Sequence, residues 1–168
     1  TEATRRVEYQ REDEDDLQFS LDYINDLDED GQRIRALGQY SLSLEGQNSD
    51  IIEREVIQDT INDVERVLED EDEIEALLQV DYELPIGEDI KWEAGYRGNY
   101  RDISNSFFLE EREVFPAGPL VPDQGLNNTF TYREFVNAVY AQYGREFGEF
   151  SILAGLRFEQ TNVEIISG

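Results

Sequence analysis

The sequence lacks cysteine, histidine and methionine, and Lys91 is its only lysine. Without cysteine, the chain forms no disulfide and offers no thiolate to a metal. Without histidine, it has neither a Ser-His triad nor a histidine metal site. Carboxylates occur along the whole chain, so no single pair stands out for acid–base catalysis. We therefore expect a protein that is not an enzyme and that needs no cofactor.

Long apolar runs and basic charge are also scarce. No stretch of 18 or more apolar residues is present, so no transmembrane helix is expected. The 168 residues carry Asp+Glu 40 against Lys+Arg 14, a net charge of −26. This charge would repel phosphates, so we expect no nucleic-acid partner and no polybasic contact with a membrane surface. An acidic, lysine-poor chain fits a halophilic source, where salt screens self-repulsion; one acidic domain in an ordinary organism is the alternative.

The sequence is rich in alternating apolar and polar residues. Between 150 and 159, apolar residues occupy the even positions, whereas Ser151, Gly155, Arg157 and Glu159 face the other way. A period of two predicts a strand rather than a helix. Similar alternation recurs at Leu17–Tyr23, Ile34–Glu45, Ala76–Leu84 and Ile90–Arg101. A strand of about 9–11 residues is long enough to cross a bilayer in a tilted barrel.

Short and long linkers alternate between the predicted strands. Short turns are expected at Asp28–Gly31, Pro85–Asp89 and Glu146–Gly148, and long connections at Gly46–Glu73 and Ile103–Thr129. Arg11–Asp16 is interpreted as a charged turn or loop. Outer-membrane barrels have this asymmetry, with short periplasmic turns and long extracellular loops. Aromatic residues that could form an interfacial girdle lie near the short turns: Tyr82, Trp92, Tyr143 and Phe150.

The segment from Gly46 to Ile74 fits two different structures. Ile57, Ile61, Val64 and Leu68 have helical spacing and would form an apolar stripe. The acidic residues that follow them would place negative charge at the negative end of the helix dipole. The alternative is a long exposed hairpin that turns near Asp59–Asp63. Periodicity alone does not decide between the two.

One acidic turn resembles the start of a calcium-binding loop. Its first, third and fifth positions are Asp26, Asp28 and Asp30, and glycine is at the sixth. The twelfth position, which should supply a bidentate glutamate, is Leu37, and the flanking segments are strands rather than helices. We interpret the segment as a plain acidic turn, with calcium binding as the weaker alternative.

The polar rows of the strands would line the lumen of a barrel, although the same pattern fits the solvated face of a soluble sheet. The candidate lumen-facing residues are Lys91, Glu93, Arg97, Arg101, Arg157 and Glu159. No particular ligand follows from them. Gly95 and Gly98 lie inside a predicted strand, where glycine marks a bend or a close approach of neighbouring groups.

Short motifs follow one another along most of the chain. They are Leu21–Tyr23 with Gly31, Tyr82–Gly87, Trp92–Tyr96, Tyr100–Ile103, Phe130–Glu134, Tyr140–Tyr143, Phe147–Ser151 and Ala154–Glu159. Their order and spacing resemble the barrel of TonB-dependent outer-membrane receptors, in particular the group with a carboxypeptidase-regulatory-like N-terminal domain. The likeness is weakest over Gly46–Glu73. There the family usually has an extended extracellular hairpin, which favours strands.

The resemblance implies an all-β fold, an antiparallel meander of about six long strands that forms a partial outer-membrane β-barrel. It implies nutrient uptake, of siderophores or glycans for example, through a barrel of about twenty-two strands. Residues 1–168 would be a single β domain, a fragment of a larger barrel in the cell outer membrane. Its partners would be the remaining strands, a plug domain, the TonB energy-coupling complex and outer-membrane lipid. The alternatives are a soluble β-rich binding or adhesion domain and a secreted calcium-binding β domain.

The apolar rows would need cover if the segment stood alone in water. We expect the row Phe150–Phe158 and the row Ala76–Tyr82 to be buried, because a band of this size far exceeds a normal exposed patch. Burial would come from a sheet curled on itself or from self-association, which would also pair the exposed edge strands.

Overall fold

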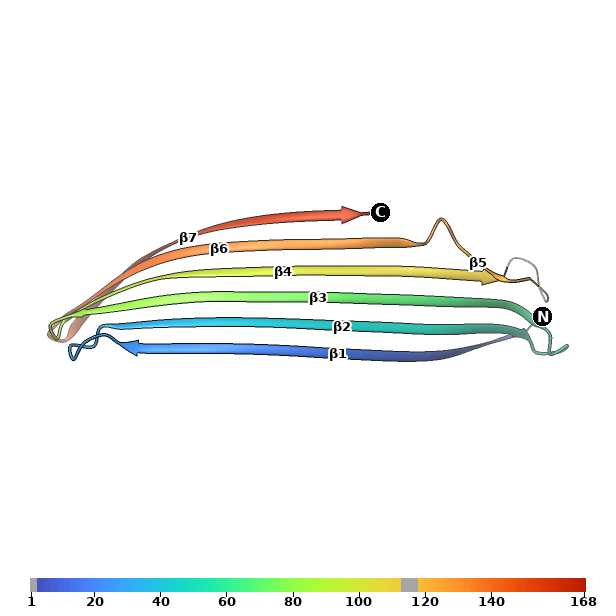
Figure 1. Cartoon of the computed structure of the whole chain (residues 1–168), viewed down its shortest axis with the longest axis horizontal. Coiled ribbons are helices and arrows are strands. Elements are labelled where there is room, and N and C mark those ends of the chain that lie inside the picture. Colours follow the sequence, from blue (N-terminus) through green and yellow to red (C-terminus); the bar gives the residue numbers. More distant parts are fainter. Residues whose placement is uncertain (1–2, 113–117) are drawn as a thin grey trace.

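The computed structural model describes residues 3–112 and 118–168, which form one antiparallel sheet in a single layer (Figure 1). The strands are β1 (Thr4–Asp26), β2 (Arg33–Glu55), β3 (Ile61–Ile86), β4 (Ile90–Arg112), β5 (Leu120–Pro122), β6 (Asn128–Phe147) and β7 (Phe150–Ser167). The order across the sheet is β1-β2-β3-β4-β6-β7, and the short β5 pairs with β4. This confirms the predicted antiparallel meander of six long strands. Within the described ranges, no helix is long and apolar enough to cross a membrane.

Three tight turns lie together at one end of the sheet, where the sequence predicted them (Figure 1). Each contains a glycine with positive φ: Gly31 at 91°, Gly87 at 65° and Gly148 at 64°. A side chain with a Cβ is strained in this region of backbone space, whereas glycine is not. The turn residues therefore determine where the strands reverse.

Two predicted loops are largely strand. The charged segment Arg11–Asp16 is continuous with the rest of β1, and every residue of β1 pairs with β2. Its acidic side chains are exposed on both faces, so their charge stays in solvent while the backbone remains paired. Likewise β4 continues to Arg112 and β6 begins at Asn128, which leaves a shorter connection than Ile103–Thr129. The loop prediction at Pro116 lies outside the described residues.

The segment from Gly46 to Ile74 is a hairpin, so the helical alternative is wrong. β2 pairs with β3 from Arg33 to Arg54, with one register shift between Glu53 and Arg54. The turn spans 56–60, slightly before the predicted position. Val64 and Leu68 are four residues apart, a spacing that puts two side chains on one face of a strand as well as of a helix.

The pairing register defines two faces, because directly opposed residues point the same way. One face carries an apolar belt next to the tight turns. The belt comprises Leu17, Phe19, Leu21 and Tyr23 of β1, Ile34–Leu44 of β2, Ile74–Ile86 of β3, Ile90–Tyr100 of β4, Phe135–Tyr143 of β6 and Phe150–Phe158 of β7, taken at alternate residues. We call this the outer face and the opposite one the polar face.

The predicted burial of the apolar rows within this sheet is wrong. Leu156 is 85% exposed and Phe158 is 70% exposed, and Leu78 is also exposed. A single layer has no second layer to cover the belt, and the sheet does not curl back on itself (Figure 1). The belt therefore needs an apolar environment outside this chain.

The belt crosses the strands obliquely. On β1 the belt ends at Leu17. When the paired residues are followed from strand to strand, the position level with Leu17 on β7 is Glu164. On β7, however, it ends at Phe158, six residues nearer the tight turns. With ~3.3 Å per residue and ~4.8 Å per strand, this offset corresponds to a strand tilt of roughly 40°. Strands of transmembrane barrels have the same tilt, about 35–45°.

Aromatic and polar side chains within the belt also match a lipid environment. The rings of Trp92 and Tyr143 pack with centroids 4.8 Å apart near the tight turns, in the predicted girdle. Farther from the tight turns, Tyr96 folds over Gly98, and its hydroxyl donates to Asn137 Oδ1 at 2.7 Å. This bond satisfies an amide oxygen that could not bond to water in hydrocarbon.

Candidate functional site: the polar face

The polar face gathers charged side chains from all six long strands and is the candidate functional site. The six residues predicted to face a lumen all lie on it: Lys91, Glu93, Arg97, Arg101, Arg157 and Glu159. The pairing accounts for this common orientation, since Arg97 is opposite Ala138, which is opposite Glu159. The alternation seen in the sequence therefore places these residues correctly relative to one another.

Near the tight turns, cations and carboxylates of the polar face pair with one another. Lys91 Nζ lies 2.9 Å from Glu83 Oε2 and 2.5 Å from Glu93 Oε1. Arg35 Nη2 donates to Asp22 Oδ2 at 2.7 Å. Each partly exposed pair contributes only up to about 1 kcal/mol. Together the pairs offset part of the negative charge on this half of the face.

Tyr140 on β6 reaches across β4 to Asp81 on β3. Its hydroxyl donates to Asp81 Oδ1 at 2.7 Å, and its ring lies over Gly95, which is paired with both residues. A Cβ on Gly95 would lie 2.6 Å from Asp81 Oδ1 and 2.7 Å from Tyr140 Cζ. Only glycine leaves room for this bridge. The sequence predicted a close approach at this glycine but did not identify Tyr140 and Asp81 as the groups involved.

Replacing Gly95 by alanine is expected to destabilise the complete barrel by about 1–3 kcal/mol, because the new Cβ forces the tyrosine ring and the carboxylate apart. Urea-induced unfolding in lipid vesicles measures the change. Gly38→Ala is the matched control, since a Cβ at that strand glycine would meet no atom within 4 Å. An equal loss of stability in both variants would show that the bridge contributes nothing.

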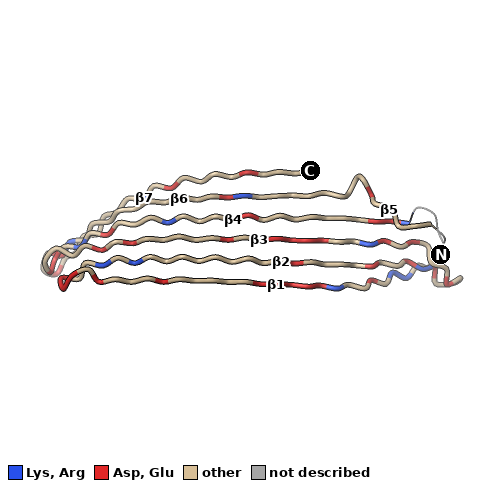
Figure 2. The backbone as a smooth tube through the Cα atoms, in the orientation of Figure 1, with Lys and Arg blue, Asp and Glu red and all other residues tan. Residues whose placement is uncertain are grey.

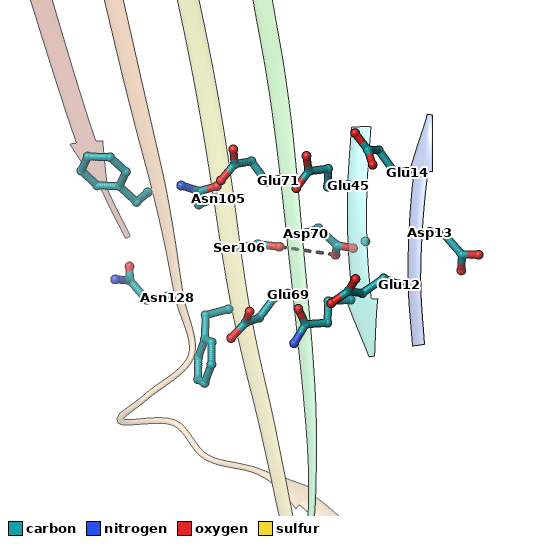
Figure 3. Close-up of a pocket in the computed structure, with 14 residues that line it drawn as sticks. Glu12, Asp13, Glu14, Glu45, Glu69, Asp70, Glu71, Asn105, Ser106 and Asn128 are labelled. Atoms are coloured by element: carbon teal, nitrogen blue, oxygen red, sulfur yellow. Dashed lines mark hydrogen bonds between the residues drawn. The ribbon is translucent and has the colours of Figure 1, made fainter. Parts of the chain in front are cut away.

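At the other half of the polar face, carboxylates meet without compensation (Figure 3). The acidic cluster consists of Glu12, Glu14, Glu45, Glu69 and Glu71. Glu14, Glu45 and Glu71 are directly opposed on three neighbouring strands, an arrangement that is destabilising for like charges. The cluster borders a hollow of about 480 Å³ that neither lysine nor arginine lines. Glu14 lies outside the belt. The negative charge of Asp16 and, less strongly, that of Glu45 raise the pKa of Glu14.

The sequence did not single out this cluster, because acidic residues occur along the whole chain. Only the pairing register shows which of them stand side by side. Within the described ranges, no group of three or more histidine, cysteine or acidic side chains could hold a metal ion.

The calcium-loop candidates form an acidic turn in the structure. The Asp28 carboxylate accepts hydrogen bonds from the backbone N–H of Asp30, at 3.1 Å, and of Gln32, at 2.8 Å. Asp26 Oδ1 accepts from Arg33 Nε at 2.5 Å. Two of the three carboxylates thus stabilise the reversal between β1 and β2 through contacts within the chain.

The apolar belt, the tilt and the charged opposite face together define a wall segment of a transmembrane β-barrel. The chain belongs to the outer membrane protein β-barrel family, whose model matches residues 6–167. Its location is therefore the outer membrane. This assignment replaces the alternatives of a soluble adhesion domain and a secreted calcium-binding domain.

Among solved structures, the chain is similar to the ferric citrate transporter FecA in its unliganded form, with 14% sequence identity and a TM-score of 0.35. The match covers 81% of this chain and 23% of the transporter. The chain therefore spans about a quarter of the length of that protein. The search of curated proteins found no match.

Proposed function

We propose that this chain forms part of the barrel of a TonB-dependent receptor for nutrient uptake and has no catalytic activity of its own. The observation that carries the proposal is the contrast between the two faces of one tilted sheet. The outer face presents a belt for lipid, whereas the polar face presents paired and unpaired charges for a water-filled lumen. The motif series from Tyr82–Gly87 to Ala154–Glu159 supports the TonB-dependent group.

In this proposal residues 1–168 are a fragment of a larger barrel. Six strands tilted by roughly 40° are too few to enclose a lumen that admits a nutrient. The remaining strands would pair with the free edges of β1 and β7, since an exposed edge invites pairing. A plug domain would fill the lumen, and the TonB complex would supply energy for uptake. The substrate would be a siderophore, a glycan or a similar nutrient.

A bulky group attached inside the proposed lumen should block uptake. The chain contains no cysteine, so Glu93→Cys in a cysteine-free complete receptor offers a single thiol on the polar face. After treatment with a large maleimide, these cells should no longer take up the nutrient. It should remain in the medium, as it does with cells that lack TonB. Mass spectrometry of the spent medium measures this.

Leu78→Cys is the matched control, because this exposed side chain lies on the outer face and would contact lipid. Treatment of this variant should leave uptake unchanged. The proposal fails if cells without TonB still take up the compound that cells without the receptor leave behind, or if both cysteine variants respond alike.

A further inference from the structure

The outer face carries a second apolar surface, beyond the membrane belt. A row of acidic residues separates the two surfaces: Asp13, Asp15, Asp70 and Asp72. Beyond this row lies what we call the distal patch, formed by Arg5, Val7, Tyr9, Arg11, Ile52, Arg54, Val64, Arg66, Leu68 and Phe108. Aliphatic and aromatic side chains here stand beside four arginines, and two carboxylates, Asp50 and Glu110, lie among them on the same face.

The distal patch is accessible and hollowed. Tyr9 is 64% exposed, and beside it lies a groove of about 300 Å³. The groove is lined by Val7, Ile52 and Val56, with Arg5 and Arg54 on one side of the charge balance and Glu55 and Asp59 on the other. The neighbouring turn adds further exposed apolar side chains. An exposed apolar surface of this kind marks an interaction site in a folded protein.

Charge on the distal patch is opposite in sign to that of the chain. Figure 2 shows Lys and Arg positions gathered along the ends of β1 and β2 near the N-terminus, in a chain of net charge −26. Arg54 lies 3.6 Å from Asp59, which is itself 84% exposed, and Arg66 pairs with Asp50 at 2.8 Å. Within the described residues Arg5 makes no ion pair. Arg11 likewise pairs with Asp13 at 3.0 Å. Arg5 is therefore directly available to an anionic partner, whereas the other three arginines would each exchange a carboxylate of this chain for one of the partner's.

Membrane lipid is not the partner that this position fits. Tyr9 lies eight residues beyond the end of the belt at Leu17. At ~3.3 Å per residue the patch is roughly 25 Å farther along the strand, outside the hydrocarbon. The intervening acidic row would also be costly to bury in lipid.

Charge and composition argue against two other partners for the distal patch, a second copy of this chain and a glycan. A second copy joined patch to patch would place arginine against arginine, which like-charge repulsion opposes. A glycan would stack on aromatic rings, but the centre of the patch is mostly aliphatic, with Val7, Ile52, Val64 and Leu68. Carboxylates beside apolar side chains would match both the arginines and the groove.

We propose that the distal patch docks a partner protein at the cell surface through a segment that carries carboxylates next to apolar side chains. The partner contacts the outside of the barrel wall, beyond the membrane. The tight turns are the periplasmic end in barrels of this kind, so the opposite end faces the exterior. This inference requires the outer-membrane barrel and is independent of what the barrel transports.

Binding of a defined peptide to the complete receptor in detergent tests the proposal. The probe is a fluorescent peptide of glutamate and leucine, compared with a lysine–leucine peptide and a glutamate–serine peptide by fluorescence anisotropy. Only the glutamate–leucine peptide should bind, and added salt should weaken it. Arg5→Glu combined with Arg54→Glu should weaken binding by about tenfold or more.

Arg6→Glu is the matched control, since this residue is next to Arg5 but lies on the polar face. It should leave peptide binding unchanged, whereas Tyr9→Ser should weaken it. An equal effect of Arg6→Glu and of the combined Arg5→Glu and Arg54→Glu change, or no binding of any peptide, would overturn the proposal. Binding of vesicles containing anionic glycolipid in place of the peptide would also overturn it and identify a glycolipid site.

Discussion

Replacing Leu156 by arginine is expected to destabilise the complete barrel in a lipid bilayer by about 2–4 kcal/mol. The side chain projects from the outer face of β7 within the apolar belt, and it is 85% exposed in this sheet. In the membrane it would contact hydrocarbon, where a guanidinium loses its hydration without gaining a partner. Urea titration of the barrel in vesicles, followed by tryptophan fluorescence, measures the loss.

Arg157→Leu is the matched control at the neighbouring position. Arg157 lies on the polar face, where it pairs with Glu159 at 2.8 Å and remains half-exposed. Loss of such a pair costs at most about 1 kcal/mol. If Arg157→Leu abolished folding while Leu156→Arg left stability unchanged, the two faces would be assigned the wrong way round.

Raising the salt concentration from low to molar values is expected to raise the unfolding temperature of this chain by about 4–8 °C. For 168 residues this shift corresponds to ~2 kcal/mol in the free energy of unfolding. The net charge is −26, and three opposed glutamates stand together in the acidic cluster. Molar salt shortens the screening length to roughly 3 Å and removes most of this repulsion. Thermal unfolding followed by circular dichroism across a salt series measures the effect.

Lowering the pH should act in the same direction as salt. The pKa of Glu14 is raised chiefly by Asp16, and the pKa of Glu65 is raised chiefly by burial. A raised carboxyl pKa means that the folded state disfavours the ionised form. Stability should therefore rise as the pH falls through the folded pKa toward the ordinary glutamate value. A melting temperature that changes with neither salt nor pH would contradict the halophilic interpretation of the composition.

Much of the fold could be predicted because alternation and turn chemistry are local properties. Side chains of successive residues point to opposite faces of any strand, so the faces of Lys91 and Trp92 follow from their order alone. Turns need glycine where φ is positive, and Gly31, Gly87 and Gly148 stand at those positions. Strand length was predicted less well, since a charged segment such as Arg11–Asp16 is extended only when a neighbour pairs with it.

The sequence by itself therefore determined the two faces, the three tight turns and the charge of the chain. The tertiary structure alone decided which distant residues meet, because the register depends on pairing along whole strands. It brought Tyr140 to Asp81 over Gly95, and it set Glu14 against Glu45. It also separated the distal patch from the membrane belt. Alternation assigns each side chain to a face, whereas only the paired sheet gives its position on that face.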